Sequence, residues 1–220
     1  MVVKVPIFPL PNSILYPGVY LPLHVFEERY KNMLKKVMES DGELAVSYAP
    51  EVQPDKFFPN MICGSGPVRI LKKYESGESD ILVFGTQRIR FNKYVQELPY
   101  LIGEGEVLHI NREMPQKTHD DLLVQIRDMV IGWIFANIED SQRPIQFFKN
   151  MADLEPLCNF VAFHFIPEFD KKQKMLEEDS LEAKAQVIWK VLKDFEASGE
   201  KNPIGAPLIF PGTQTDEGFN

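Results

Sequence analysis

Leu21-Pro-Leu-His-Val-Phe-Glu-Glu-Arg-Tyr30 leads into an apolar pattern that continues to Val37. Spacings of three and four predict one helix with a single buried face. That face comprises Phe26, Tyr30, Met33, Leu34 and Val37. On the opposite side Glu27, Lys31 and Lys35 lie four residues apart, which favours ion pairs along the helix.

On both sides of this helix, from Val2 to about Ile110, the pattern is short and strand-like, with frequent Pro and Gly. The runs 68–72 and 81–84 flank Glu75-Ser-Gly-Glu-Ser79, which predicts a hairpin with a glycine-containing loop. This half is therefore expected to be β-rich.

Arg88-Ile-Arg-Phe91 alternates with period two, so Ile89 and Phe91 are expected to be buried and both arginines to face solvent. Leu101 to Ile110 is expected to be the closing strand. Its glycines at positions 103 and 105 predict a bulge or a close approach of backbones, because no helix start follows them.

After about Asn111 the period changes to 3.6 residues, which predicts three helices. Thr118 and Asp121 resemble a capping box, Asp153 is expected to cap the second helix, and Gly199 is expected to end the third, which begins near Ser180. The expected buried positions are Leu122, Ile126, Val130, Trp133 and Ile134; then Leu154, Leu157, Cys158, Val161 and Phe165; then Leu181, Ala185, Ile188, Val191, Leu192 and Phe195. We thus expect a β-rich subdomain (1–110), a helical bundle (111–199) and a C-terminal tail (200–220).

The composition is that of a globular protein, with 44% hydrophobic and 25% charged residues and a net charge of −8. The acidic balance disfavours nucleic acid as the main partner. Cys63 and Cys158 are too few for a disulfide scaffold, which favours a reducing cytoplasm. Prolines interrupt the N-terminal apolar run, so we expect no signal peptide, and no apolar run is long enough to cross a membrane.

Motifs for catalysis or cofactors are missing from the sequence. There is no Gly-Lys-Ser or Gly-Lys-Thr triplet for a phosphate loop, and the histidines lack zinc-ligand spacing, so we expect no cofactor and no metal. Gly64-Ser65-Gly66 lacks the full nucleophile-elbow pattern and is interpreted as a tight turn. His164 is expected to be a hydrogen-bonded core residue, and Glu177-Glu-Asp179 a solvated helix junction.

His24 lies near Glu27 and Arg29, which predicts a structural hydrogen-bond network that closes the turn before the helix. Phe57-Phe58-Pro59 lies in a Pro-bounded stretch without periodicity, so its rings are candidates for an exposed contact.

Three blocks resemble the N-terminal, substrate-binding domain of Lon proteases. The first comprises Pro6-Ile-Phe-Pro-Leu10, Leu15-Tyr-Pro-Gly18 and Leu21 to Tyr30 with Met33. The second comprises Gly85-Thr-Gln-Arg-Ile-Arg-Phe91 with Pro99-Tyr-Leu101, and the third is Gln173-Lys-Met-Leu-Glu177. One departure is Glu28, where many relatives carry proline; this affects only the local helix start.

This resemblance implies an α+β fold, namely a PUA-like, partly open β-barrel with one helix followed by a small α-helical bundle. It also implies a non-enzymatic polypeptide-binding module, an adaptor or a holdase. No ATPase or Ser-Lys protease motif is present, so we expect a stand-alone protein without these activities. Unfolded or partly folded polypeptides are the expected partners, and a protease or a chaperone is a candidate second partner.

For peptide contacts we select Tyr16, Tyr20, Phe57 and Phe58, and for the structural motif of the family His24, Glu27, Arg29 and Tyr30. Two alternatives stay open. Because PUA-like barrels also occur in RNA-modifying proteins, Arg69, Arg88, Arg90, Lys72 and Lys73 on one sheet face would bind RNA. A hydrolase would use Ser65 and a distant histidine.

Overall fold

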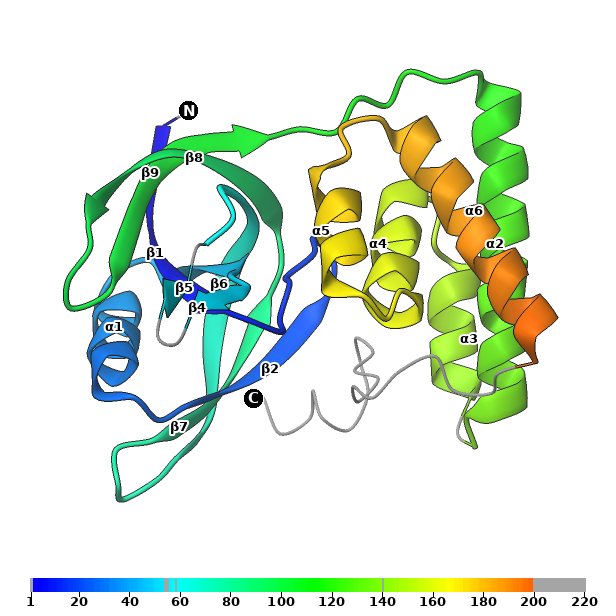
Figure 1. Cartoon of the computed structure of the whole chain (residues 1–220). Coiled ribbons are helices and arrows are strands. Elements are labelled where there is room, and N and C mark those ends of the chain that lie inside the picture. Colours follow the sequence, from blue (N-terminus) through cyan, green and yellow to red (C-terminus); the bar gives the residue numbers. More distant parts are fainter. Residues whose placement is uncertain (1, 54–55, 58, 140, 200–220) are drawn as a thin grey trace. The chain divides into compact units, whose positions relative to one another are not determined.

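The computed structural model describes residues 2–53, 56–57, 59–139 and 141–199 (Figure 1). The chain divides into two compact units, Met1–His109 and Ile110–Asn220. In the described residues the first unit is β-rich with one helix, and the second is helical, so the α+β class is confirmed. The predicted tail, residues 200–220, lies outside the described residues.

Within its described residues, the β-rich unit has a mixed sheet of seven strands in the order β2-β7-β6-β3-β1-β9-β8 and a separate hairpin of two. The sheet strands are β1 (Val2–Leu10), β2 (Tyr20–Val25), β3 (Glu43–Tyr48), β6 (Ile62–Lys73), β7 (Ser79–Phe84), β8 (Gln87–Gln96) and β9 (Leu101–Leu108), and the hairpin is β4 (Glu51–Gln53) and β5 (Lys56–Phe57). Strands β1 and β3 run parallel, and the other pairs are antiparallel.

Strand β6 belongs to two parts of the sheet. Its first residues, Ile62 to Pro67, pair with β3 and β8, and its later residues, from Val68 to Lys73, pair with β7. The β6–β8 pairing closes a ring of β6, β3, β1, β9 and β8, from which β7 and β2 extend. The result is the expected partly open barrel rather than a regular closed one.

Side chains from β1, β3, β6 and β8 form one core cluster of this unit: Val5, Ile7, Ala45, Cys63, Ile89 and Phe91. The predicted burial of Ile89 and Phe91 is confirmed. Arg88 was expected in solvent, and this prediction is wrong, because its side chain is only 2% exposed. The alternation of side chains along a strand predicts which residues share one face of the sheet. It does not predict whether the opposite face, here that of Arg88, is also covered by other parts of the chain.

The glycines of Gly64-Ser-Gly66 lie inside β6, so the predicted tight turn is wrong. A Cβ at Gly64 would collide with the carbonyl oxygen of Leu15, and one at Gly66 with that of Phe84. The two glycines thus allow backbones to approach closely. In β9 the expected close approach of backbones is confirmed at Gly105, where a Cβ would collide with the backbone of Arg90. At Gly103 a Cβ would collide with the side chains of Phe91 and Ile7 instead.

Helix α1 (Glu28–Glu39) buries Tyr30, Met33, Leu34 and Val37, as its periodicity predicts. Phe26 is an exception, because it precedes the helix and is 59% exposed. The ion pairs of α1 also differ from the predicted pairing of Glu27 with Lys31. Instead, Glu27 pairs with Arg29 at 2.8 Å, and Lys31 lies 3.8 Å from Glu28.

The described helices of the second unit are α2 (Gln116–Asn137), α3 (Gln142–Lys149), α4 (Leu154–Phe165), α5 (Phe169–Glu177) and α6 (Leu181–Ser198). Three of them, α2, α4 and α6, were expected. Helix α4 is central, because every residue from Leu157 to Phe165 is buried. Its partners α2 and α6 are amphipathic and contribute one buried stripe each.

Two of the predicted caps are confirmed and one is wrong. Asp153 accepts a hydrogen bond from the backbone of Glu155, as predicted. Ser180, which was predicted only as the start of the third helix, caps α6 by accepting a hydrogen bond from the backbone of Ala183. Gly199 ends α6 at a φ of 69°, where a glycine has no Cβ penalty. Helix α2, however, begins at Gln116 behind Pro115, so Thr118 lies inside the helix and does not cap it.

The short helices α3 and α5 were not expected. Pro144 lies in the first turn of α3, where its missing N–H is tolerated. Helix α5 buries Lys172, Gln173 and Leu176, a set with little apolar signal. The buried stripe of α2 also shifts to Leu123, Ile126, Val130 and Ile134, with Leu122 and Trp133 half-buried.

Candidate functional site

An apolar groove lies in the helical unit, where α5 and α6 meet the C-terminal end of α4. Its volume is about 400 Å³. The apolar lining comes from the end of α4 and from one face each of α5 and α6: Phe165, Ile166, Met175, Val187, Val191 and Phe195. Val187 is 42% exposed, so a branched apolar side chain faces water here. An apolar hollow of this kind, lined by described residues, is a candidate docking surface.

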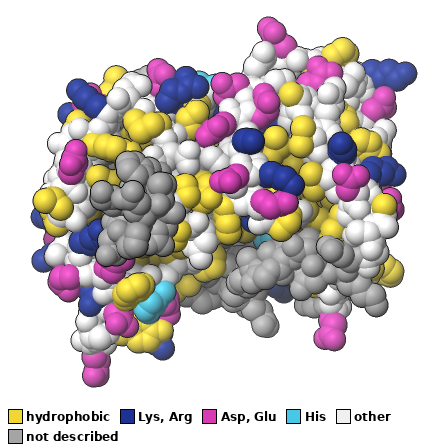
Figure 2. Space-filling view, in the orientation of Figure 1, with side chains coloured by type: hydrophobic (Ala, Val, Ile, Leu, Met, Phe, Trp, Pro, Cys, Tyr) yellow, Lys and Arg dark blue, Asp and Glu magenta, His cyan; other side chains and the backbone are white. Residues whose placement is uncertain are grey.

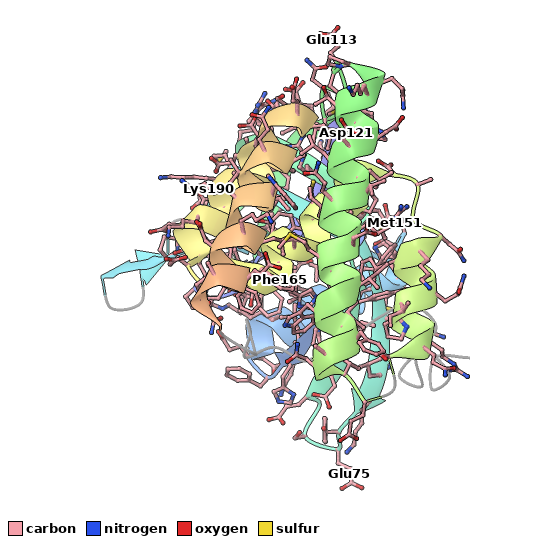
Figure 3. All side chains as sticks on the ribbon, turned by 90° about the vertical axis from the view of Figure 1, so that its right-hand side faces the viewer. Glu75, Glu113, Asp121, Met151, Phe165 and Lys190 are labelled. Atoms are coloured by element: carbon pink, nitrogen blue, oxygen red, sulfur yellow. The ribbon has the colours of Figure 1, made fainter. Side chains whose placement is uncertain are left out.

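The floor of this groove is built on a chain of aromatic rings. The ring of Phe165 lies 5.1 Å from that of Trp133 on α2 and 5.2 Å from that of Phe195 on α6, both edge to face. Figure 3 shows Phe165 between these two helices. Both contacts have the edge-to-face geometry that aromatic pairs favour, so the Phe165 ring is held by packing from two helices.

The rim of the groove carries charges of both signs. Lys171 donates to Glu168 at 2.7 Å, within α5, while Lys174 on α5 and Asp194 on α6 complete the rim. An apolar floor with a mixed polar rim is the usual anatomy of a protein-binding surface.

The four residues selected for peptide contacts are not brought together as one exposed face. Tyr16 is 0% exposed, and burial raises the pKa of its hydroxyl well above its ordinary value, so its ring offers no surface. Tyr20 on β2 is half-buried, with its ring 4.6 Å from that of Phe84. Phe57 belongs to β5, whereas Phe58 lies outside the described residues.

His24 has partners other than those expected from its sequence neighbours. Its Nδ1 lies 2.7 Å from Asp80 on β7, its Nε2 lies 3.5 Å from Glu78, and Tyr74 donates to Asp80 at 2.6 Å. Hydrogen bonds from Tyr74 and His24 lower the pKa of Asp80. Because His24 and Asp80 face each other across β2 and β7, the network links these strands rather than closing the turn.

The other members of the predicted structural motif stabilise the start of α1. Arg29 pairs with Glu27 and lies 4.6 Å over the ring of Tyr30. Tyr30 is buried, with its ring 4.4 Å from that of Phe8 on β1.

The positions proposed for catalysis or RNA binding are not brought together as one exposed face, because Arg69, Lys72 and Lys73 are exposed on β6 whereas Ser65 and Arg88 are buried. Ser65 is fully buried and donates to Glu43 at 2.8 Å. Arg88 is buried and Arg90 lies 3.8 Å from Glu106. On the face shown in Figure 2, positive and negative side chains are interspersed, without a large basic field. Among the described residues no His, Cys, Asp and Glu side chains gather into a group that could hold a metal ion.

Residues 177–179 form the junction between α5 and α6, as expected. Glu178 accepts a hydrogen bond from the backbone of Ser180, and the carbonyl of Asp179 accepts one from Asn111. No helix in the described part of the chain combines the length and apolarity required for a membrane span.

Comparison with known proteins confirms the resemblance. Residues 4–194 match the family described as the ATP-dependent protease La (LON) substrate-binding domain. The chain belongs to this family. It is 24% identical to the Lon protease of Cytophaga hutchinsonii over 204 residues, which cover 90% of this chain and 25% of that protein. The Lon protease of Acinetobacter baumannii is 23% identical over 197 residues, covering 87% of this chain and 24% of that protein.

Solved structures show the same fold. The N-terminal domain of Mycobacterium avium complex Lon protease aligns with a TM-score of 0.65 at 15% identity and covers 87% of this chain and 99% of that one. The Lon N-terminal domain protein from Xanthomonas campestris aligns with a TM-score of 0.60 at 17% identity, covering 86% and 98%. The chain therefore spans about a quarter of the curated Lon proteases but nearly the whole of their isolated N-terminal domains.

Proposed function

We propose that this chain is a non-enzymatic polypeptide-binding module, which holds apolar segments of unfolded or partly folded proteins in the groove between α5 and α6. The observation that carries the proposal is this groove of about 400 Å³, in a chain whose family is described as substrate-binding. An adaptor and a holdase are the two roles that such binding serves, with a protease or a chaperone as the second partner.

The chemistry of the groove fits a short apolar stretch rather than a polar ligand. Val187, Val191 and Met175 offer aliphatic contacts without a buried charge at the floor. Each side chain that a partner fully buries here contributes about 1.5–3 kcal/mol, but ordering a flexible segment offsets much of this. We therefore expect weak binding of single peptides, with selectivity for apolar content over exact sequence.

The compartment proposed for this activity is the cytoplasm. Both Cys63 and Cys158 are free thiols, which fits a reducing environment.

The test replaces one exposed valine at the groove and one elsewhere on the helical unit. Val187→Asp places a carboxylate at the groove, whereas Val124→Asp makes the same change on α2, at a residue of similar exposure (42% and 44%) outside the groove lining. The probes are reduced, carboxymethylated lactalbumin and a fluorescein-labelled peptide of Leu, Phe and Ser. We expect V187D to weaken binding about tenfold and V124D to change it less than about twofold.

Folding of both variants is checked by circular dichroism. Equal binding by V187D and the unmodified chain would exclude the groove, and absence of binding by the folded, unmodified chain would exclude polypeptide recognition. Tyr20, Phe57 and Phe58 are proposed as additional contacts, and a pull-down with the Phe57→Ala/Phe58→Ala variant tests the last two.

A further inference from the structure

A second hollow lies in the β-rich unit, between α1 and the hairpin of β6 and β7, with a volume of about 230 Å³. We call it the lysine cleft, after Lys31 and Lys35 of α1 and Lys73 of β6, which line it. Its volume is below the roughly 300–1,000 Å³ of typical small-molecule and cofactor sites. It therefore suits individual side chains of a larger partner.

The lysine cleft is positively charged, although the chain carries a net charge of −8. Glu78 also lines it, but its carboxylate lies 3.5 Å from His24 Nε2. Neither Lys35 nor Lys73 forms a salt bridge with a described residue, and both are exposed. Two ammonium groups are thus available to carboxylates of a partner.

The lysine cleft also has an apolar floor. Leu34 is buried, Ile70 is half-buried, and Met38 is 46% exposed at the edge of the cleft. Because lysine ammonium groups lie beside apolar side chains here, the cleft best fits a ligand that is both acidic and apolar. Inorganic phosphate would satisfy the charges and leave the floor exposed to water.

Lys31 holds the two walls of the cleft together. Its Nζ donates to the carbonyl of Ser76 at 3.1 Å, in the turn between β6 and β7, and lies 3.8 Å from Glu28. Because this contact ties α1 to the hairpin, the cleft exists before a ligand binds, which lowers the cost of binding.

We propose that the lysine cleft binds an acidic segment of a polypeptide, whose apolar side chain contacts Leu34, Ile70 and Met38 and whose carboxylates pair with Lys35 and Lys73. A long polyanion such as RNA would extend beyond the cleft over a chain whose net charge is −8, which disfavours it. A short acidic segment experiences chiefly the local field, since charges beyond about 8 Å are screened at physiological salt. This site is separate from the groove of the helical unit and does not depend on the function proposed for it.

The test uses a fluorescein-labelled peptide in which Glu residues flank Leu and Phe, and the same peptide with Lys in place of Glu. We expect the acidic peptide to bind with an affinity that falls as salt is added. The Lys35→Glu/Lys73→Glu variant is expected to bind it about tenfold more weakly. The matched control is Lys36→Glu/Lys93→Glu, which makes the same charge change at exposed lysines outside the cleft lining. For this control we expect a change below about twofold.

Two further variants keep the outcome unambiguous. Lys35→Gln/Lys73→Gln removes the charges without reversing them, and Met38→Gln removes the apolar edge; both are expected to weaken binding by a factor of about three. Three results would each overturn the proposal. They are equal affinities for the Lys and the Glu peptide, an affinity for the Glu peptide that K35E/K73E leaves unchanged, and binding of single-stranded RNA to the same lysines that is stronger than that of the Glu peptide. The peptides also carry Leu and Phe, which the groove of the helical unit would accept, so their affinities are measured in the Val187→Asp background as well. The lysine-dependent part of the binding is expected to persist there, which separates failure here from failure of the groove.

Discussion

Arg112 and Asp153 form a two-point contact, with Nη1 and Nη2 of the guanidinium 2.8 and 3.2 Å from the two carboxylate oxygens. The same carboxylate caps α4 by accepting from the backbone of Glu155 at 3.1 Å. Burial alone would raise the pKa of Asp153, but the bonds from Arg112 and from the Glu155 backbone lower it. Arg112 therefore orients the cap of the central helix.

Two substitutions separate the cap from the ion pair. Arg112→Ala is expected to lower the free energy of unfolding by about 1 kcal/mol, because the pair is half exposed and screened by solvent. Asp153→Ala is expected to cost about 2 kcal/mol, since the cap is lost as well. Urea denaturation measures both, with Lys171→Ala, which removes an exposed pair within α5, as a control near zero. Because R112A also removes the contact between Arg112 and Glu155, the cap is measured by the loss that D153A adds in the R112A background, and no added loss there would show that the cap contributes nothing.

Gly64 is expected to tolerate no side chain. Its Cβ would collide with the backbone carbonyl of Leu15, so Gly64→Ala should destabilise the β-rich unit by about 3 kcal/mol or more. Gly132, in the middle of α2, has no atom within 4 Å of a Cβ, so Gly132→Ala should stabilise the helical unit by up to about 1 kcal/mol. Thermal denaturation followed by circular dichroism measures both changes. A folded G64A variant of unchanged stability would contradict the close approach.

Periodicity predicted the elements whose apolar faces are buried by tertiary packing. Helices α1, α2, α4 and α6 were found this way, and local sequence signals predicted the caps at Asp153 and Gly199. Contacts between distant segments were not predictable. Gly64 and Gly66 face backbone from elsewhere in the chain, and neither residue has a local signal that distinguishes this arrangement from a tight turn.

The groove was missed because α5 has few apolar residues. Helix α6 nevertheless carries a signal. Val191 and Phe195 were expected in its buried stripe but are only half-buried, and with Val187 they form a second apolar row at spacings of four. This apolar surface is wider than one packing interface requires, which indicates a further contact. The sequence carried no comparable signal for the lysine cleft, because Lys73 is distant in sequence from Lys31 and Lys35 and only the tertiary structure brings the three residues to one cleft.

Both cysteines are expected to resist modification in the folded chain. Burial raises the pKa of the Cys63 thiol far above its ordinary value, and burial raises that of Cys158 to about 12. Since the thiolate is the reacting species, iodoacetamide at pH 8 should leave both unmodified and should label both in urea. Mass spectrometry of the labelled chain measures this, and rapid native labelling of either residue would contradict its burial.

His164 is expected to make the helical unit sensitive to acid. It is buried on α4, its ring lies 4.5 Å from that of Phe160 and 4.7 Å from that of Phe163, and Nδ1 has no hydrogen-bond partner in the described structure. The predicted hydrogen bond is therefore absent at this nitrogen. Burial lowers the pKa of His164 to about 3, and the positive charge of Lys172 contributes in the same direction.

The sign of the effect follows from proton binding. The unfolded chain protonates this histidine near pH 6.5, whereas the folded chain keeps it neutral until about pH 3. Between these values the unfolded state binds more protons, so the free energy of unfolding falls with decreasing pH, by up to about 1.4 kcal/mol per pH unit. His164→Leu and His164→Gln should each reduce this slope, and His109→Gln, at an exposed position, should not. Urea denaturation of the four proteins at pH 7 and pH 5 measures the slopes, and equal slopes for H164L, H164Q and the unmodified chain would refute the assignment.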